Sequence, residues 1–226
     1  MEILPKLWCA DVIPELTSVP IMIRGPASAF QLETLTALGI SRERLRFFTG
    51  NVLALKTVIF SSPIVPGNCS AEVVSWLRSK ILPLAGSAPA QPEGLVYVSR
   101  NRASSRRLLN EEQLVPRLEA RGFRSYTMEE MTVKQQLEIF GHAKMVVMPH
   151  GAAGSNIVFA QPGCVLIEMM PLTYENYDHL IYASLNNCIY GAIFCDSSPR
   201  PEDNMVVDID KLLNVVDRAL ETWPTS

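Results

Sequence analysis

The sequence predicts an α/β protein with parallel sheets flanked by helices, and two observations lead to this fold class. Short apolar runs rich in β-branched residues alternate with segments of helical periodicity, which is typical of βαβ units. The apolar runs are nearly continuous, as expected for strands that helices cover on both faces. Strands are expected at residues 20–23, 45–48, 57–61, 95–99, 123–126, 144–148, 165–169 and 189–194.

Start signals mark two of the intervening helices. Ser28 with Gln31, and Thr132 with Gln135, have the spacing of a capping box, in which the hydroxyl and the amide satisfy backbone N–H groups reciprocally. A last helix is expected over residues 210–222, where apolar residues recur at helical spacing and would pack against the sheet.

A break between two lobes is expected at residues 83–94, which hold three prolines and two glycines between two periodic segments. We therefore expect two lobes, residues 1–82 and residues 95–226, joined by this linker. The first lobe contains about three expected strands, fewer than the typical sheet of about five to six. It is expected to be short or truncated.

Composition narrows the class of protein. Hydrophobic residues make up 48% and charged residues 19% of the 226 residues, which indicates a globular rather than a disordered chain. A net charge of −3 argues against non-specific nucleic-acid binding. No apolar run approaches the roughly 20 residues of a transmembrane helix. Five cysteines without metal-ligand spacing favour a reduced cytoplasmic compartment and predict no metal site, and docking on the inner face of a membrane is compatible with this.

The first group of candidate site residues is an arginine-rich loop after strand 95–99. Seven arginines and no lysines lie between residues 94 and 124, and four of them are Arg100, Arg102, Arg106 and Arg107. Ligands bind at the carboxyl edge of parallel sheets, and guanidinium groups match phosphate oxygens, so this loop predicts a diphosphate clamp. The alternative is a solvated loop with surface ion pairs. Asn110 could likewise be a helix N-cap.

The second group follows strand 144–148. His150 is placed at the strand end, and Gly151 and Ala152 begin a turn of small residues that lets a ligand approach the backbone closely. Asn156 lies in the helix that this turn opens. The alternatives are structural: His150 could hold the turn, and Asn156 could bond loop backbone.

The third candidate is Glu168, a single carboxylate near the end of a buried strand. A buried charge is costly unless it is partnered, and either ribose hydroxyls or a neighbouring Arg or His could serve. Because all three groups follow strands of one expected sheet, we expect them to meet at one edge.

Taken together, these motifs resemble glycosyltransferase family 61, which includes capsular-polysaccharide enzymes, plant xylan-decorating xylosyltransferases and the EGF-domain O-GlcNAc transferase. The order and spacing of motifs over residues 96–171 carry the resemblance, and residues 4–39 resemble the preceding part of the same domain. The motifs are Ser99-Arg100, Arg106 to Glu111, Gly122-Phe123, Gln136 to Phe140, His150 to Ala153 with Asn156 and Phe159, and Gly163 to Glu168.

The resemblance implies two Rossmann-like lobes in a GT-B-like arrangement and inverting transfer from a nucleotide sugar, usually a UDP-sugar, without a cofactor or an obligatory metal. It implies catalytic residues at His150 and Glu168, the latter facing the nucleoside, and donor-nucleotide-binding residues at Arg100, Arg106, Asn110, Gly151, Ala152 and Asn156. The arginine loop is longer than in some members, which leaves Arg102 as an alternative to Arg100. Members usually carry further N-terminal sequence with an aromatic segment before the run at residues 4–7.

Three functions are compatible with these features. The leading hypothesis is a glycosyltransferase that moves a sugar onto a glycan or polysaccharide acceptor in cell-surface polysaccharide synthesis. The alternative is a non-catalytic nucleotide-binding module that retains the donor lobe. A hydrolase with His150 as base ranks lower, because the sequence lacks a nucleophile-elbow motif such as GxSxG.

Overall fold

The first part of the chain carries a small two-stranded sheet. A computed structural model describes residues 4–59, 70–86, 93–174 and 176–222. Strands β1 (Ile21–Arg24) and β2 (Leu45–Phe48) pair in parallel. The helices of this part are η1 (Leu4–Trp8), α1 (Cys9–Val12), η2 (Pro14–Leu16), α2 (Ala29–Ala37), η3 (Arg42–Arg44), α3 (Ala71–Ile81) and η4 (Leu82–Ala85).

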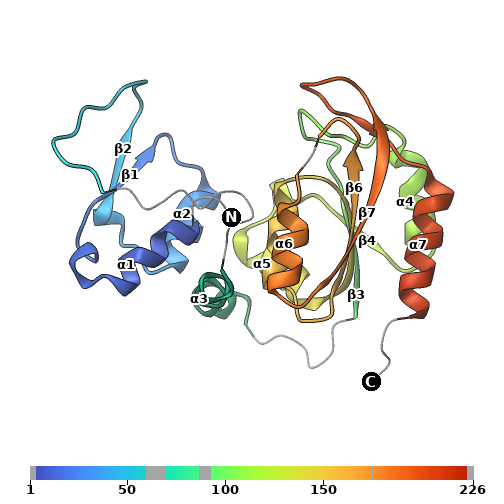
Figure 1. Cartoon of the computed structure of the whole chain (residues 1–226), viewed down its shortest axis with the longest axis horizontal. Helices are drawn as coiled ribbons and strands as arrows, with labels where there is room; N and C mark the ends of the chain where they lie inside the picture. Colours follow the sequence, from blue (N-terminus) through green and yellow to red (C-terminus); the bar gives the residue numbers. More distant parts are fainter. Residues whose placement is uncertain (1–3, 60–69, 87–92, 175, 223–226) are drawn as a thin grey trace.

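The second part is built on a six-stranded sheet of order β4-β3-β5-β6-β7-β8, in which β8 pairs antiparallel to β7 and the other pairs are parallel. Its strands are β3 (Gly94–Val98), β4 (Arg124–Tyr126), β5 (Ala143–Pro149), β6 (Val165–Pro171), β7 (Ile189–Ser197) and β8 (Met205–Val206). The helices are α4 (Glu111–Glu119), η5 (Met128–Glu130), α5 (Val133–His142), η6 (Ala152–Phe159), α6 (Asp178–Leu185) and α7 (Ile209–Glu221). Helices α5 and α6 lie on one side of this sheet and α4 and α7 on the other (Figure 1).

The two faces of the larger sheet bury different apolar sets. Val96, Val146 and Leu166 point into a core with α3, α5, η6 and α6. Tyr97 and Ile167, which are offset by one residue, point into a second core with α4 and α7. This alternation is the period of a strand, and it explains why the central strands are apolar throughout.

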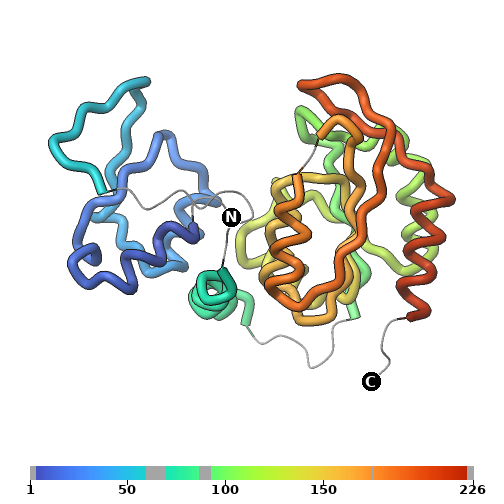
Figure 2. The backbone as a smooth tube through the Cα atoms, viewed as in Figure 1, coloured from blue at the N-terminus to red at the C-terminus, as the bar shows by residue number. Residues whose placement is uncertain are grey.

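Helix α3 connects the first part of the chain to the larger sheet, as the path of the backbone shows (Figure 2). Its Arg78 donates through Nη1 to the carbonyl oxygens of Val158 and Ala160 at the end of η6. Glu33 of α2 accepts a hydrogen bond from the backbone N–H of Val133 at the start of α5. The first core also includes buried residues of both parts, so the packing is continuous from α2 and α3 to β3.

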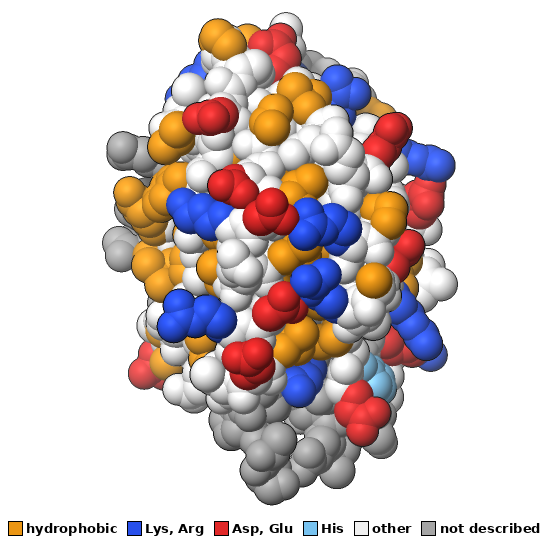
Figure 3. Space-filling model, turned by 90° about the vertical axis from the view of Figure 1, so that its right-hand side faces the viewer, with side chains coloured by type: hydrophobic (Ala, Val, Ile, Leu, Met, Phe, Trp, Pro, Cys, Tyr) orange, Lys and Arg blue, Asp and Glu red, His pale blue; other side chains and the backbone are white. Residues whose placement is uncertain are grey.

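The outer face formed by α4 and α7 carries acidic and basic side chains interspersed with apolar ones (Figure 3). Two ion pairs lie on this face: Arg117 of α4 pairs with Asp210 of α7, and Arg121, just after α4, pairs with Asp217 of α7. Because charges of both signs alternate, this face presents no single-sign field of the kind that attracts nucleic acid.

The structure confirms the α/β class and the parallel arrangement of most strands. Both capping boxes form, at Ser28 with Gln31 and at Thr132 with Gln135. The expected strand at 57–61 is wrong where it can be tested: residues 57–59 form no strand, and residues 60 and 61 lie outside the described residues. Among the described residues, no strand pairs with residues 57–59, and β propensity alone does not make a strand.

Two further observations concern short segments. Strand β8 has two residues, which is too short to give a periodic pattern. The expected linker begins inside the 3-10 helix η4, and its residues 87–92 lie outside the described part of the chain. No helix in the described ranges combines the length and the apolar composition needed to cross a membrane.

Replacing Thr132 by alanine should destabilise the fold by about 1 kcal/mol, because Thr132 Oγ1 accepts from the N–H of Gln135 at the start of α5. Thr127 is the matched control, since it precedes η5 without a side-chain capping bond. Urea unfolding should therefore show a lower midpoint for Thr132→Ala and a nearly unchanged one for Thr127→Ala. Equal midpoints would contradict this account of helix α5.

Candidate functional site

The three groups of candidate residues meet at one edge of the larger sheet. Strands β3, β5 and β6 are parallel neighbours, so the loops that follow them leave the sheet at the same edge. The guanidinium of Arg100 lies against the turn after β5: a Cβ built on Gly151 would come within 2.7 Å of its Cζ. His150 Nδ1 lies 2.6 Å from Glu168 Oε1. These contacts bring together residues from the loops after β3 and β5 and from β6 itself, where Glu168 lies in the middle of the strand and not near its end as expected.

Two arginines at this edge have buried donors without an acceptor. The Nε atoms of Arg100 and Arg106 are buried, and neither has a hydrogen-bond partner among the described residues. Burial lowers the pKa of Arg100, and the nearby charge of Arg106 lowers it further, while Glu129 acts in the opposite direction. Two cations with unsatisfied donors in a desolvated place are costly, and an anion placed between them would offset that cost.

The backbone at Arg106 is held in an unusual conformation. Its φ of 56° is left-handed, a region that non-glycine residues seldom adopt. The N–H of Arg106 donates to the carbonyl of Glu202 at 2.6 Å. Its Cζ lies 4.9 Å from the centre of the Tyr174 ring. A residue held in this way has a fixed side-chain direction, as is typical of ligand sites.

The other two arginines of the loop are placed differently. Arg102 is exposed and forms an ion pair with Glu130. Arg107 is exposed, and its backbone N–H donates to Asn204 Oδ1. Of the two alternatives for the first clamp residue, the structure therefore brings Arg100 to the glycine turn and leaves Arg102 in a surface ion pair.

Glu168 is fully buried and fully partnered. Its Oε1 accepts from Nδ1 of His150 and from Nδ1 of His179, both at 2.6 Å, and its Oε2 accepts from the hydroxyl of Tyr190 at 2.7 Å. Burial by itself raises the pKa of Glu168, but the hydrogen bonds and charges of the two histidines outweigh it and bring this pKa to about 2. The carboxylate is therefore ionised, and its partners are protein groups, one of the two alternatives left open by the sequence.

His179 and Tyr190 were not identified from the sequence. His179 lies on α6, and its ring packs against Gly154. A Cβ at Gly154 would come within 2.5 Å of His179 Nδ1, so the lack of a side chain there leaves space for the ring. Tyr190 lies on β7. Tyr174, which was also missed, has its ring centre 5.0 Å from that of His150. A histidine among apolar residues of a helix was the available signal for His179, but it is equally common in ordinary cores.

The two asparagines of the predicted site make structural hydrogen bonds. Asn110 donates to the carbonyl of Val207 and accepts from its N–H, and its side chain does not cap α4. Asn156 donates to Gln136 Oε1. Ala152 is exposed at the start of η6. The structure thus groups Arg100, Arg106, His150, Gly151 and Glu168 and places the two asparagine amides against other protein atoms.

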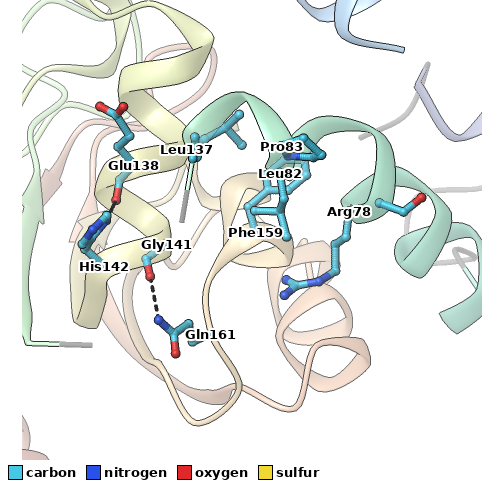
Figure 4. Close-up of a pocket in the computed structure, with 12 residues that line it drawn as sticks. Arg78, Leu82, Pro83, Leu137, Glu138, Gly141, His142, Phe159 and Gln161 are labelled. Carbon is cyan, nitrogen blue, oxygen red and sulfur yellow. Dashed lines mark hydrogen bonds between the residues drawn. The ribbon is translucent and has the colours of Figure 1, made fainter. Parts of the chain in front are cut away.

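A cavity of ≈ 370 Å³ lies elsewhere, between η4, α5 and η6 (Figure 4). Leu82, Leu137 and Phe159 line it, with Arg78 at one side. His142, which also lines it, precedes the first residue of β5, whereas His150 follows the last one. The cavity is therefore at the opposite end of that strand from the arginine pair.

His150, Glu168 and His179 also place three potential metal-ligand atoms within 4.8 Å of one another. Two ligands of one tetrahedral zinc ion lie about 3.4 Å apart, given metal–ligand distances near 2.1 Å. The N···O distances here are 2.6 Å. They fit hydrogen bonds better than the shell of an ion.

The model of the family Glycosyltransferase 61 matches residues 2–167, which include the arginine loop and His150. The chain belongs to glycosyltransferase family 61. The match ends one residue before Glu168, and His179 and Tyr190 lie beyond it.

A relative of this family 61 protein is the Protein O-linked-mannose beta-1,4-N-acetylglucosaminyltransferase 2 of Tetraodon nigroviridis. The two are 28% identical over 126 residues, which cover 54% of this chain. The alignment spans 21% of the length of that relative, about a fifth. Family membership and this relative support glycosyl transfer as the general activity.

Replacing Gly151 by alanine should leave the fold stable and weaken anion binding at least tenfold, or about 1.4 kcal/mol. The backbone at Gly151 is extended, with φ of 178°, so alanine adds no backbone strain. Its methyl group would instead displace the Arg100 guanidinium. Calorimetric titration with pyrophosphate measures the change. Gly141→Ala is the control, because nothing lies within 4 Å of a Cβ at that position.

Glu168 should stabilise the fold at neutral pH and lose this effect in acid. Because the pKa of Glu168 is lowered from 4.5 to about 2 in the folded state, its ionised form stabilises the fold above pH 4.5. That contribution is lost as the pH falls from 4.5 towards 2. Glu168→Gln should cost about 2–3 kcal/mol at neutral pH and progressively less in this acidic window. Denaturant unfolding against pH measures this, and the exposed Glu119→Gln is the control. A difference that does not change with pH would contradict it.

Proposed function

We propose that this family 61 glycosyltransferase moves a sugar from a UDP-sugar donor to a glycan or polysaccharide acceptor with inversion at the anomeric carbon. The observation that carries the proposal is the pair of buried, unpartnered Nε donors on Arg100 and Arg106 among the described residues. A nucleoside diphosphate is the anion that a sugar nucleotide leaves behind, and it would satisfy both donors at once.

The arginine pair suits this chemistry for electrostatic reasons. Negative charge grows on the diphosphate as its bond to the sugar breaks, and fixed donors in a desolvated place stabilise that charge. Guanidinium groups can also bind two phosphate oxygens in one plane, which a lysine cannot do. Gly151 and Ala152 would add backbone contacts from the turn against which Arg100 lies. In this proposal the arginines neutralise the leaving group, and no metal is required.

His150 and Glu168 are the proposed catalytic pair. His150 follows the strand that leads into the Gly151 turn, so it lies beside the residues that hold the diphosphate. Glu168 keeps its charge beneath His150 through a hydrogen bond of 2.6 Å. For Asn110 and Asn156, we propose that they support the loops of the donor site rather than contact the donor, since both amides bind protein atoms.

The proposed architecture is GT-B-like, with residues 1–82 as the acceptor-side lobe, 83–94 as linker and 95–226 as the donor lobe. The parallel pair β1 and β2 in the acceptor-side lobe and the largely parallel sheet in the donor lobe support this arrangement. The name of the relative describes transfer of N-acetylglucosamine to O-linked mannose, which makes a glycan acceptor reasonable here. We propose a cytoplasmic location, compatible with docking on the inner face of a membrane, and a role in surface polysaccharide synthesis.

A second candidate is a nucleotide-binding module without catalytic activity. The described residues of the first region form a sheet of two strands, which offers little surface for an acceptor. The two functions differ in turnover: only the enzyme releases UDP from a UDP-sugar in the presence of an acceptor glycan.

Removing Arg106 should weaken UDP binding by more than tenfold, because a desolvated charge-assisted contact contributes roughly 1.5–3 kcal/mol. Arg106→Asn is the sharper variant, since asparagine tolerates the left-handed backbone at this position and alanine does not. Isothermal titration with UDP, with and without a chelator, measures both the affinity and any need for metal.

The neighbouring Arg107→Ala serves as control, because its exposed side chain lies outside the pair. Its affinity for UDP should match that of the unmodified protein. Unchanged affinity in Arg106→Asn, or equal losses in the two variants, would refute the clamp.

A further inference from the structure

Three elements direct hydrogen-bond donors at one carboxylate. His150 follows β5, His179 lies on α6 and Tyr190 lies on β7, and all three donate to Glu168 of β6. The two histidines share a single oxygen, Oε1, while Tyr190 takes Oε2. An ionised carboxylate oxygen has two lone pairs in its plane, so the histidines saturate Oε1.

This arrangement determines which ring nitrogen of His150 carries its proton. An ionised carboxylate only accepts, so Nδ1 of each histidine must be the donor. In a neutral imidazole the other nitrogen, Nε2, is then an acceptor. The two nitrogens of the ring point in widely divergent directions, so Nε2 of His150 points away from Glu168. Among the described residues, the hydrogen-bond partner of the His150 side chain is Glu168.

We propose that His150 Nε2 is the base that takes the proton of the acceptor hydroxyl, and that His179 is the positioning residue that makes this possible through Glu168. The proposal rests on the proposed function. His179 holds the second lone pair of Oε1 and so prevents the carboxylate from turning away from His150.

The acceptor O–H bond breaks and its proton moves to Nε2 of His150, while the acceptor oxygen forms a bond to the anomeric carbon. The bond from that carbon to the diphosphate oxygen breaks, and its electron pair leaves with the nucleoside diphosphate beside the arginine pair. His150 becomes imidazolium, whose Nδ1–H still donates to Glu168, and later returns the proton to water.

The position of His179 is fixed from two sides. Its ring faces Gly154 of η6, where a Cβ would come within 2.5 Å of both Nδ1 and Cε1, so any side chain there would overlap the ring. The ring centres of His179 and His150 lie 5.0 Å apart. His179 therefore cannot move towards η6 or towards His150, and its Nδ1 stays on Glu168. Since its hydrogen bond goes to Glu168, His179 acts through the carboxylate and not on the donor.

The charged and titratable groups around His150 come from each neighbouring element. Glu168 lies beneath it on β6 and His179 faces it from α6. Tyr174, in the loop after β6, lies against its ring, and the cation of Arg106 lies over Tyr174. Of these groups, Glu168 is the one that hydrogen-bonds the His150 ring.

The test uses the tautomer, which does not depend on knowing the substrate. The chain contains three histidines, His142, His150 and His179, so long-range ¹H–¹⁵N spectra of the full chain labelled with ¹⁵N-histidine contain few signals. At about pH 8, His150 and His179 should both show a protonated Nδ1, which donates to Glu168, and an unprotonated Nε2. The third histidine, His142, is exposed, and His142→Gln identifies its signals by removing them.

Two substitutions at His179 separate positioning from packing. His179→Asn keeps an N–H close to the position of Nδ1, and should preserve the His150 signals. His179→Leu removes the donor, and the nitrogen shifts of His150 should move towards the average of two exchanging tautomers. Gly154→Ala, which displaces the His179 ring, should give the same change as His179→Leu.

Several results would overturn the proposal. They are a protonated Nε2 on His150 in the unmodified chain, an unchanged His150 spectrum in His179→Leu, or equal spectra for the Asn and Leu variants. Loss of both Nδ1–H signals on adding zinc at stoichiometric amounts, restored by a chelator, would instead show a metal site. UDP affinity should stay within about threefold in His179→Leu. If UDP binds neither the unmodified chain nor any variant, but the histidine tautomers are as expected, then the donor assignment fails and the positioning role of His179 stands.

Discussion

The candidate site depends on one buried charge, the carboxylate of Glu168 in the middle of the larger sheet. An ionised group at zero exposure is unfavourable unless donors surround it, and here they come from β5, β7 and α6. Each donor fixes its own element against β6. Because His150 is one of them, the Gly151 turn is also fixed, and with it the surface on which Arg100 rests.

Two kinds of charge therefore meet at this edge of the sheet, and they differ in how well they are partnered. The negative charge of Glu168 has all its donors inside the protein, whereas Arg100 and Arg106 keep buried donors that no described residue satisfies. A protein can retain buried donors without acceptors at a place where a bound ligand supplies the acceptors. The saturated carboxylate thus belongs to the framework of the site, and the unsaturated cations face what binds there.

Most of the helices and strands could be predicted from the sequence, because the patterns that mark them are local. The capping boxes and apolar strands involve residues close in the chain, so their patterns identified most elements, and the order of strands indicated that Arg100, His150 and Glu168 would meet. His179 and Tyr190 could not be found in this way, because their link to Glu168 spans 11 and 22 residues and arises only when α6 and β7 pack on β6. The pairing of Asn110 with Val207 spans 97 residues. A run of β-branched residues at 57–59 suggested a strand that no described neighbour completes.

Long-range backbone hydrogen bonds also hold the arginine loop in place. The N–H of Arg106 donates to the carbonyl of Glu202, the carbonyl of Arg107 accepts from Met205, and the N–H of Leu109 donates to the carbonyl of Met205. The loop therefore lies alongside residues 202–205, which include the start of β8. Ordering a loop on binding reduces affinity, because side-chain and backbone freedom is lost at that moment. Here the loop is ordered by its own backbone, and the strain at Arg106 is offset by these bonds. The free energy of an anion contact can then appear largely as affinity, which is what the proposed binding of a departing diphosphate requires.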